Sequence, residues 1–272
     1  MKAKQLQHFT IIGAIGLFGA MSEAATVPYF EDFESYAAGD TAVTNFTEVS
    51  TADWTIVSPS FAGKAYQNAI GVTVGGPGLA AGQNSSSAID LPSAASSSFS
   101  ISTSFRIDSL TATSVDPSGH AFVGLAARAA DGTWASSGAD RYEVLYYLDG
   151  ITGRPAGKLY LSERNLFFGD GLGGALSTGT LPIVLGDIYT LTLAGTPSGG
   201  SLEVSATLTD STSGSAISVA ATDSANVLTG SFFGYSNSVR VQDGGMTAIN
   251  VDFDNFSASL ADLVFRDGFE GP

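Results

Sequence analysis

The feature that most constrains this chain is a two-residue period in its hydrophobic pattern. From Phe99 to Ile107 the larger side chains fall at every second position, which puts them on one face of an extended strand. The same period recurs in the runs 189–193, 202–208 and 249–253. Further strand-like runs lie at 54–58, 121–128, 142–148, 158–163 and 231–235. The pattern predicts a chain made of many short strands.

Turn residues separate these runs. They stand at 131–132, 149–150, 197–200 and 243–245, and no apolar stripe of helical period follows the first 24 residues. Short strands joined by polar turns predict an all-β fold, an antiparallel jelly-roll β-sandwich or a barrel. In an outer-membrane barrel the last strand usually runs to the C-terminus, whereas this chain ends in Phe-Glu-Gly-Pro. We therefore expect the sandwich.

The N-terminus has the layout of a cleavable export signal. Lys2 and Lys4 precede an apolar stretch at 9–20 that is too short to span a bilayer, and small residues follow it. We expect residues 1–24 to be a signal peptide that is cleaved after Ala24, which predicts a secreted, extracellular protein. No later segment approaches about 18 consecutive apolar residues, so we expect no membrane insertion.

Composition narrows the partners. The chain has 272 residues, no cysteine and a formal net charge of −15. Without cysteine there is no disulfide, thiolate chemistry or zinc–thiolate site. The acidic balance argues against nucleic acid or an anionic membrane surface as a partner, because both require a basic face. Carboxylates do suit calcium, although most surface charges of this kind are simply solvated.

Both ends of the predicted sandwich resemble a known superfamily. The segments 30–36 (Phe-Glu-Asp-Phe-Glu-Ser-Tyr) and 251–256 (Val-Asp-Phe-Asp-Asn-Phe) resemble the first and last strands of concanavalin A-like lectin and glucanase sandwiches, including laminin-G-like domains. The resemblance covers about residues 28–259, and it implies fold better than activity. In the tail, 260–272, residues 264–270 resemble a short Phe-x-Asp-Gly-Phe-Glu ending of secreted gammaproteobacterial proteins.

An enzyme of this superfamily is one alternative, a glycoside hydrolase or a polysaccharide lyase. The chain lacks the Glu-x-Asp-x-x-Glu and Gln-x-His motifs that such enzymes carry, and His120 is expected at a junction between loop and strand. A hairpin register that places 148 opposite 158 would also place Glu143 opposite Glu163, as a general acid and base pair. Such a pair needs a cation such as Arg141 or Arg164. The alternatives are a different register or a solvated pair.

The function that we expect is glycan binding by a lectin-like sandwich, with a polysaccharide or glycoconjugate as partner. Aromatic rings stack on sugar faces while polar side chains fix orientation. Alternation puts the tyrosines 142 and 146 on one strand face and tyrosine 147 on the other. Packing of these rings in the core, and a purely structural surface or matrix module, are the alternatives. The candidate ligand-binding residues are Trp134, Tyr142, Tyr146, Tyr147, Tyr160 and Arg128.

The resemblance also implies a structural calcium ion away from the ligand face, where the first and last strands meet. Its carboxylate ligands would come from Asp32 and Glu34 on one side and from Asp252 and Asp254 on the other, with backbone carbonyls of the 37–40 turn. Bringing these carboxylates together without a cation would cost free energy through repulsion. Separate, solvated carboxylates are the alternative.

Overall fold

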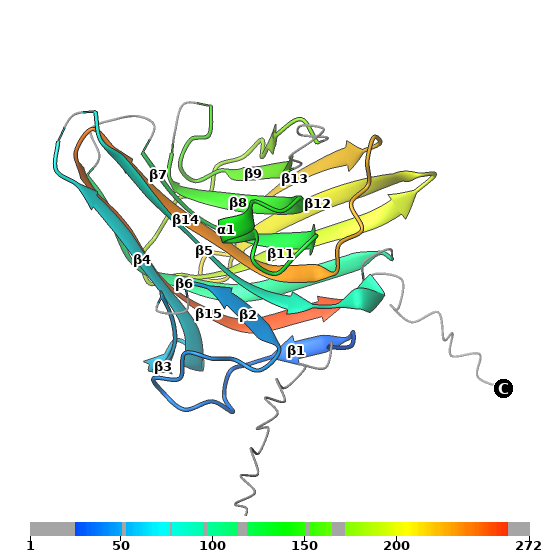
Figure 1. Cartoon of the computed structure of the whole chain (residues 1–272), viewed down its shortest axis with the longest axis horizontal. Helices are drawn as coiled ribbons and strands as arrows, with labels where there is room; N and C mark the ends of the chain where they lie inside the picture. Colours follow the sequence, from blue (N-terminus) through cyan, green and yellow to red (C-terminus); the bar gives the residue numbers. More distant parts are fainter. Residues whose placement is uncertain are drawn as a thin grey trace, which may run out of the picture.

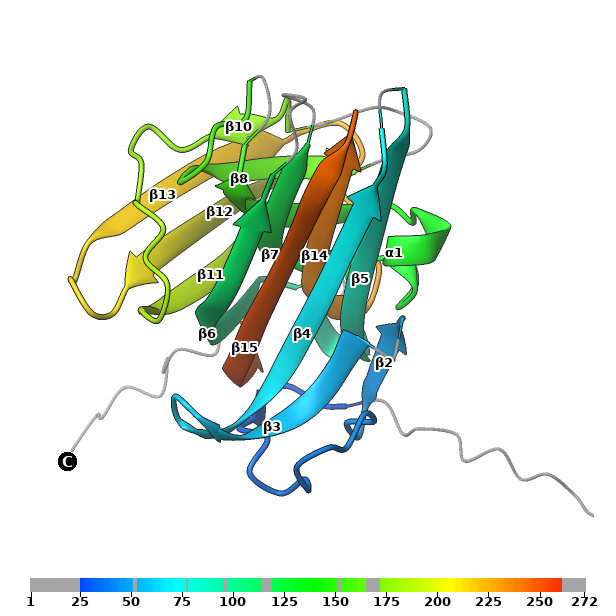
Figure 2. The same ribbon diagram turned by 90° about the vertical axis from the view of Figure 1, so that its left-hand side faces the viewer.

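The computed structural model describes residues 25–50, 53–76, 78–94, 97–113, 119–150, 153–164 and 172–260. Its strands run from Tyr29 to Ser259 and form two antiparallel sheets stacked as a sandwich (Figures 1 and 2). This confirms the predicted all-β, antiparallel jelly-roll sandwich. The predicted signal peptide, 1–24, and nearly all of the predicted tail, 260–272, lie outside the described residues.

One sheet has eight strands. Seven follow the order β13-β12-β11-β6-β15-β4-β3, and β1 pairs with the end of β15. The strands of this sheet are β1 (Tyr29–Glu31), β3 (Trp54–Ser60), β4 (Gly63–Val74), β6 (Phe99–Ala112), β11 (Ile188–Ser198), β12 (Ser201–Asp210), β13 (Ala216–Asp223) and β15 (Gly245–Ser259).

The other sheet has seven strands in the order β10-β9-β8-β7-β14-β5-β2. A one-turn helix, α1 (Trp134–Ser137), lies on its outer side between β7 and β8 in the sequence, and a 3-10 turn, η2 (Pro92–Ala94), follows β5 (Figure 2). The strands of this sheet are β2 (Phe46–Val49), β5 (Ala80–Asp90), β7 (His120–Ala129), β8 (Arg141–Asp149), β9 (Leu159–Arg164), β10 (Ala175–Leu176) and β14 (Phe232–Gln242).

The last two strands occupy interior positions. β14 lies between β7 and β5 in one sheet, and β15 lies between β6 and β4 in the other. β1 joins β15 with Phe30 opposite Ser257, so the first and last strands are neighbours, as the resemblance implied. Of the expected 30–36 run, only its beginning is strand.

The two-residue period does set the core. Phe99, Ile101, Thr103, Phe105 and Ile107 of β6 are all buried and alternate with half-buried neighbours. They pack between the sheets with the apolar faces of the other strands. Alternation along each strand therefore separates an inner face, which fills the sandwich, from an outer face that is free for other uses.

An aromatic cluster joins the two sheets. The Trp54 ring of β3 stacks on Tyr66 of β4 with ring centroids 4.7 Å apart, and it lies 5.7 Å from Tyr235 of β14. Tyr235 in turn contacts Phe253 of β15 at 4.5 Å. All four rings are almost entirely buried, so this cluster is a main source of apolar stabilisation across the sandwich.

Within the described part of the chain, no helix is both long enough and apolar enough to span a bilayer.

Candidate ligand-binding site

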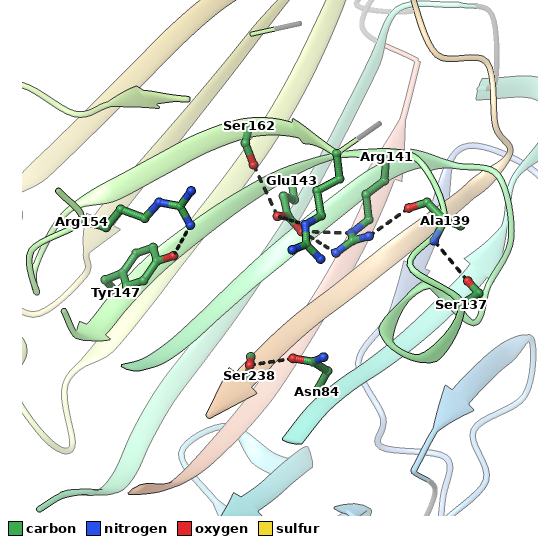
Figure 3. A network of polar contacts seen from close by, with 10 residues as sticks. Asn84, Ser137, Ala139, Arg141, Glu143, Tyr147, Arg154, Ser162 and Ser238 are labelled. Atoms are coloured by element: carbon green, nitrogen blue, oxygen red, sulfur yellow. Dashed lines mark hydrogen bonds and ion pairs between the residues drawn. The ribbon is translucent and has the colours of Figure 1, made fainter. Parts of the chain in front are cut away.

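A groove of about 890 Å³ lies on the outer face of the seven-stranded sheet. Its lining comes from β5, β14, β7, β8 and β9, which are consecutive in the sheet, and from α1 at one end. Small side chains such as Ser236 and Ser238 of β14 form part of the floor, while larger polar and aromatic side chains from β8 and β9 form one side. Figure 3 shows part of this lining, including Ser238, Glu143 and Tyr147.

Gly124 of β7 allows close approach of β7 and β8 beside the groove. A Cβ atom there would lie 2.2 Å from the carbonyl oxygen of Val144 on β8, so no larger residue fits without moving the strand. The backbone N–H of Gly124 donates to Asn237 Oδ1 at 3.3 Å, and Ser238 Oγ donates to Asn84 Oδ1 at 2.7 Å. Asn84, Asn237 and Ser238 therefore supply hydrogen-bonding groups to the floor of the groove.

Alternation along β8 divides its aromatic residues between the core and the groove. Tyr142 and Tyr146 face inward: the Tyr142 hydroxyl donates to Asp223, and the Tyr146 hydroxyl donates to the Leu181 carbonyl oxygen at 3.0 Å. Tyr147 faces the groove. The prediction that 142 and 146 share one face is confirmed, and that face is the core side of β8 rather than the groove side. Their role as ligand-binding residues stays a prediction, and the groove does not include them.

Arg128 is also a structural residue rather than part of the groove lining. Only 1% of it is exposed, and its guanidinium donates to the carbonyl oxygens of Leu228, at 3.0 Å, and Ser97, at 2.7 Å. It also lies over the Phe99 ring, 5.3 Å from the centroid. Its predicted role as a ligand-binding residue stays a prediction, while the hydrogen bonds that it makes connect two loops at the end of the core.

The predicted register of the β8–β9 hairpin is wrong by one residue. Tyr142 lies opposite Glu163, and Glu143 lies opposite Ser162. A slip of one residue exchanges the two faces of a strand, so Glu143 and Glu163 are not a cross-strand pair. Both are buried at the groove, but the direct pairing on which the acid and base reading rested does not occur.

The negative charge of Glu143 is compensated by Arg141 and Arg164, the two cations that the sequence analysis named. Arg141 Nη2 lies 2.8 Å from Glu143 Oε2, and Arg164 Nε lies 3.6 Å from Oε1 (Figure 3). Arg141 also donates to the Ala139 carbonyl oxygen at 2.9 Å, which anchors it near α1. Because Arg141 and Glu143 are each only 4% exposed, their pairing offsets the large cost of removing two charges from water.

Arg154 is held in the groove by two phenols. Its Nη1 donates to the Tyr147 hydroxyl at 3.1 Å and its Nη2 donates to the Tyr160 hydroxyl at 2.8 Å. The guanidinium carbon lies 3.8 Å from the centroid of the Tyr160 ring, which is a close cation–π contact. Burial raises the pKa of Tyr147 and outweighs the opposite effect of Arg154, so this phenol stays neutral and accepts the hydrogen bond.

Four rings form a row across β7, β8 and β9, which we call the aromatic row: His120, Phe122, Tyr147 and Tyr160. Successive ring centroids lie 5.4, 5.5 and 6.4 Å apart. His120 is the first residue of β7, which confirms its expected place at the start of a strand. The rings of His120 and Phe122 are half-buried. Trp134 lines the groove from α1, but only 1% of it is exposed.

The predicted calcium ligands do not all meet. Both carboxylate oxygens of Asp252 already have partners on neighbouring strands of the same sheet. Arg106 Nη2 lies 3.1 Å from one oxygen, and Gln67 Nε2 donates to the other at 2.8 Å. Glu34 accepts a hydrogen bond from the Lys64 backbone N–H. Among the described residues no group of three or more His, Cys, Asp and Glu side chains could hold a metal ion. The four-carboxylate arrangement therefore does not fit the ion as predicted.

Asp254 is the carboxylate of this set that lacks compensation. Burial raises its pKa to about 6, and the nearby carboxylates of Asp32 and Glu34 add to the rise. Asn255 Nδ2 donates to Oδ2, while Oδ1 has no hydrogen-bond partner among the described residues. The ionised form is thus destabilised in the folded state, as the sequence argument on repulsion anticipated.

We expect Asp254→Asn to stabilise the protein at pH 7 by about 1–2 kcal/mol, after allowance for solvent screening of the pKa shift. Because folding raises the pKa of Asp254, the protonated side chain favours the folded state. This contribution to stability is complete below about pH 4 and is lost as the pH rises through about 6. The advantage of the variant should therefore vanish near pH 3.5. Urea unfolding at both pH values, with EDTA present, measures this difference.

Millimolar calcium added to the same unfolding experiment tests the metal prediction. An ion at Asp254 would bind the folded state and raise the urea midpoint of the wild type but not that of Asp254→Asn. Equal curves with calcium and with EDTA would remove the predicted site. An increase in stability of the same size in both proteins would show that calcium binds at a site that does not include Asp254.

Fold and groove together define a jelly-roll sandwich with an open, polar and aromatic groove on one sheet. No family model and no curated protein matches the sequence. Among solved structures, basic winged bean lectin with Tn-antigen is 16% identical with a TM-score of 0.46, over 86% of this chain and 99% of that chain. Lectin II from Ulex europaeus is 13% identical with a TM-score of 0.43, over 85% and 99%. Winged bean acidic lectin with methyl-α-D-galactose is 11% identical with a TM-score of 0.49, over 85% and 98%.

Proposed function

We propose that this protein is an exported, lectin-like sandwich that binds a glycan in the groove of its seven-stranded sheet. The observation that carries the proposal is the aromatic row beside a floor of hydroxyl and amide groups. Sugars present apolar ring faces and a fringe of hydroxyl groups, and this combination of rings and polar groups complements both. Export rests on the signal-like N-terminus.

Groove shape supports a chain of sugars rather than a single one. Five neighbouring strands contribute to the lining, and strands lie about 4.8 Å apart in a sheet, so the groove runs about 19 Å across them. That length accommodates a short run of linked sugars. Most of the lining comes from strands of one sheet, so the groove is largely preformed and little ordering is needed on binding.

Replacing Phe122 with alanine is expected to weaken glycan binding about 10-fold, because a half-buried ring that stacks on a sugar contributes about 1–2 kcal/mol. Phe61→Ala is the matched control, since Phe61 is equally half-buried but lies at the β3–β4 turn of the other sheet. A glycan array identifies the ligand, and isothermal titration calorimetry measures Kd for both variants.

Turnover assays on the bound polysaccharide separate binding from catalysis. Binding without release of reducing ends supports the proposal. Release that Glu143→Gln abolishes would overturn it in favour of a hydrolase, and eliminative release of unsaturated sugars would overturn it in favour of a lyase. Failure to bind any polysaccharide would leave a structural surface or matrix module.

A further inference from the structure

The groove is basic on a strongly acidic protein. The whole sequence has 11 Lys and Arg against 26 Asp and Glu. Among the described residues that line the groove, the arginines are 141, 154, 164 and 240, and the acids are only Glu143 and Glu163. About a third of all cationic side chains thus lie at one site that holds fewer than a tenth of the acidic ones. A cluster of positive side chains on a protein with a large negative net charge indicates that the site has a function.

Two of the four arginines are not neutralised. Arg141 forms an ion pair with Glu143, and Arg164 forms a second, longer ion pair with the same carboxylate. Arg154 donates to two neutral phenols, and Arg240 is exposed on β14 beside His120 of β7. In the described part of the chain, neither Arg154 nor Arg240 has a carboxylate within ion-pair distance. Their positive charges therefore face the groove.

Arg154 is also oriented in advance. The two phenols and the cation–π contact fix the plane of its guanidinium, yet they use only two of its five N–H donors. A planar fork with free donors matches a carboxylate or a sulfate group, to which it can donate two parallel hydrogen bonds. Neutral sugars offer no group that needs such an arrangement.

We propose that the ligand is an anionic polysaccharide whose carboxylate or sulfate groups bind Arg154 and Arg240. This inference rests on the proposed glycan-binding function and specifies its ligand class. Arg154 lines the groove from the segment between β8 and β9 and Arg240 from β14, so a polymer with repeated negative groups contacts both at once. The net charge of −15 repels polyanions elsewhere on the surface, which confines their binding to the groove.

The test uses calorimetric titration of the full mature chain with four probes: polygalacturonate, its carboxyl-reduced neutral form, a sulfated galactan and the desulfated galactan. We expect binding to an anionic probe and at least a 10-fold loss for its neutral counterpart. Binding to polygalacturonate alone assigns a carboxylate ligand, and binding to the sulfated galactan alone assigns a sulfate ligand.

Arg154→Gln and Arg240→Gln should each weaken binding of the anionic probe by about 10- to 100-fold, the loss typical of a charge-assisted contact. Arg106→Gln, on the other sheet, makes the same change in net charge and should leave Kd unaltered. Thermal unfolding confirms that all three variants are folded. Equal binding by wild type and both groove variants would overturn the assignment.

The outcomes also distinguish the two proposals. Equal affinity for charged and neutral forms would overturn the anionic ligand while the glycan-binding function stands. No binding to any of the four probes, together with no binding on a glycan array, would remove both.

Discussion

Replacing Arg141 with methionine is expected to lower the free energy of unfolding by about 3 kcal/mol. The change removes the main partner of Glu143, a carboxylate that is 4% exposed, and leaves it buried with the exposed Arg164 at 3.6 Å and the Ser162 hydroxyl at 3.4 Å. A buried charge that loses its partner typically costs about 3–5 kcal/mol, and Arg164 moderates this. Urea denaturation followed by circular dichroism measures the loss.

A double-mutant cycle shows whether the pair itself is responsible. Glu143→Met alone also breaks the pair, but Arg141→Met combined with Glu143→Met removes both charges and fills the same space with apolar groups. We expect the double variant to be more stable than Arg141→Met alone. If the two single losses simply add, Arg141 stabilises the protein through its bond to Ala139 rather than through Glu143.

Trp54→Ala is expected to cost about 3–5 kcal/mol, the range for removing a large aromatic side chain from a core. Trp54 is fully buried and contacts rings of both sheets, so the cavity would open in the middle of the aromatic cluster. Unfolding monitored by near-ultraviolet circular dichroism gives the size of the loss.

Two further variants make that result specific. The indole Nε1 of Trp54 has no hydrogen-bond partner among the described residues, so Trp54→Phe should cost clearly less than Trp54→Ala. Phe30→Ala removes a ring that is 60% exposed and should change stability by less than about 0.5 kcal/mol. A small effect of Trp54→Ala would contradict the placement of this ring in the core.

The strands that could be predicted from the sequence are those with alternating large apolar residues. β4 and β5 were missed although they are long and pair on both sides, because their inward and outward positions carry small or polar residues such as Asn68, Gly71 and Ser86. Sheet neighbours supply the hydrogen bonds and packing that make such a segment a strand, and these neighbours are distant in the sequence.

The candidate site was predicted only in part, for two physical reasons. Periodicity shows which residues of β8 share a face but not which face is the core, since both carry aromatic rings; it therefore does not show that Tyr142 and Tyr146 lie on the core side. The register of the hairpin depends on the geometry of the intervening loop, which its length does not determine. Arg154 and Arg240 are 86 positions apart in the numbering, so only the fold brings them to one groove.

The interior positions of the last two strands determine when the molecule can be completed. Without β15 the larger sheet consists of two separate groups, β13-β12-β11-β6 and β4-β3, and without β14 the smaller one divides between β7 and β5. A growing chain therefore cannot close either sheet until its final segment is available, and the many distant pairings make folding slow. The edges of β6, β4, β7 and β5 that these two strands cover therefore remain unpaired until the last part of the chain has been made.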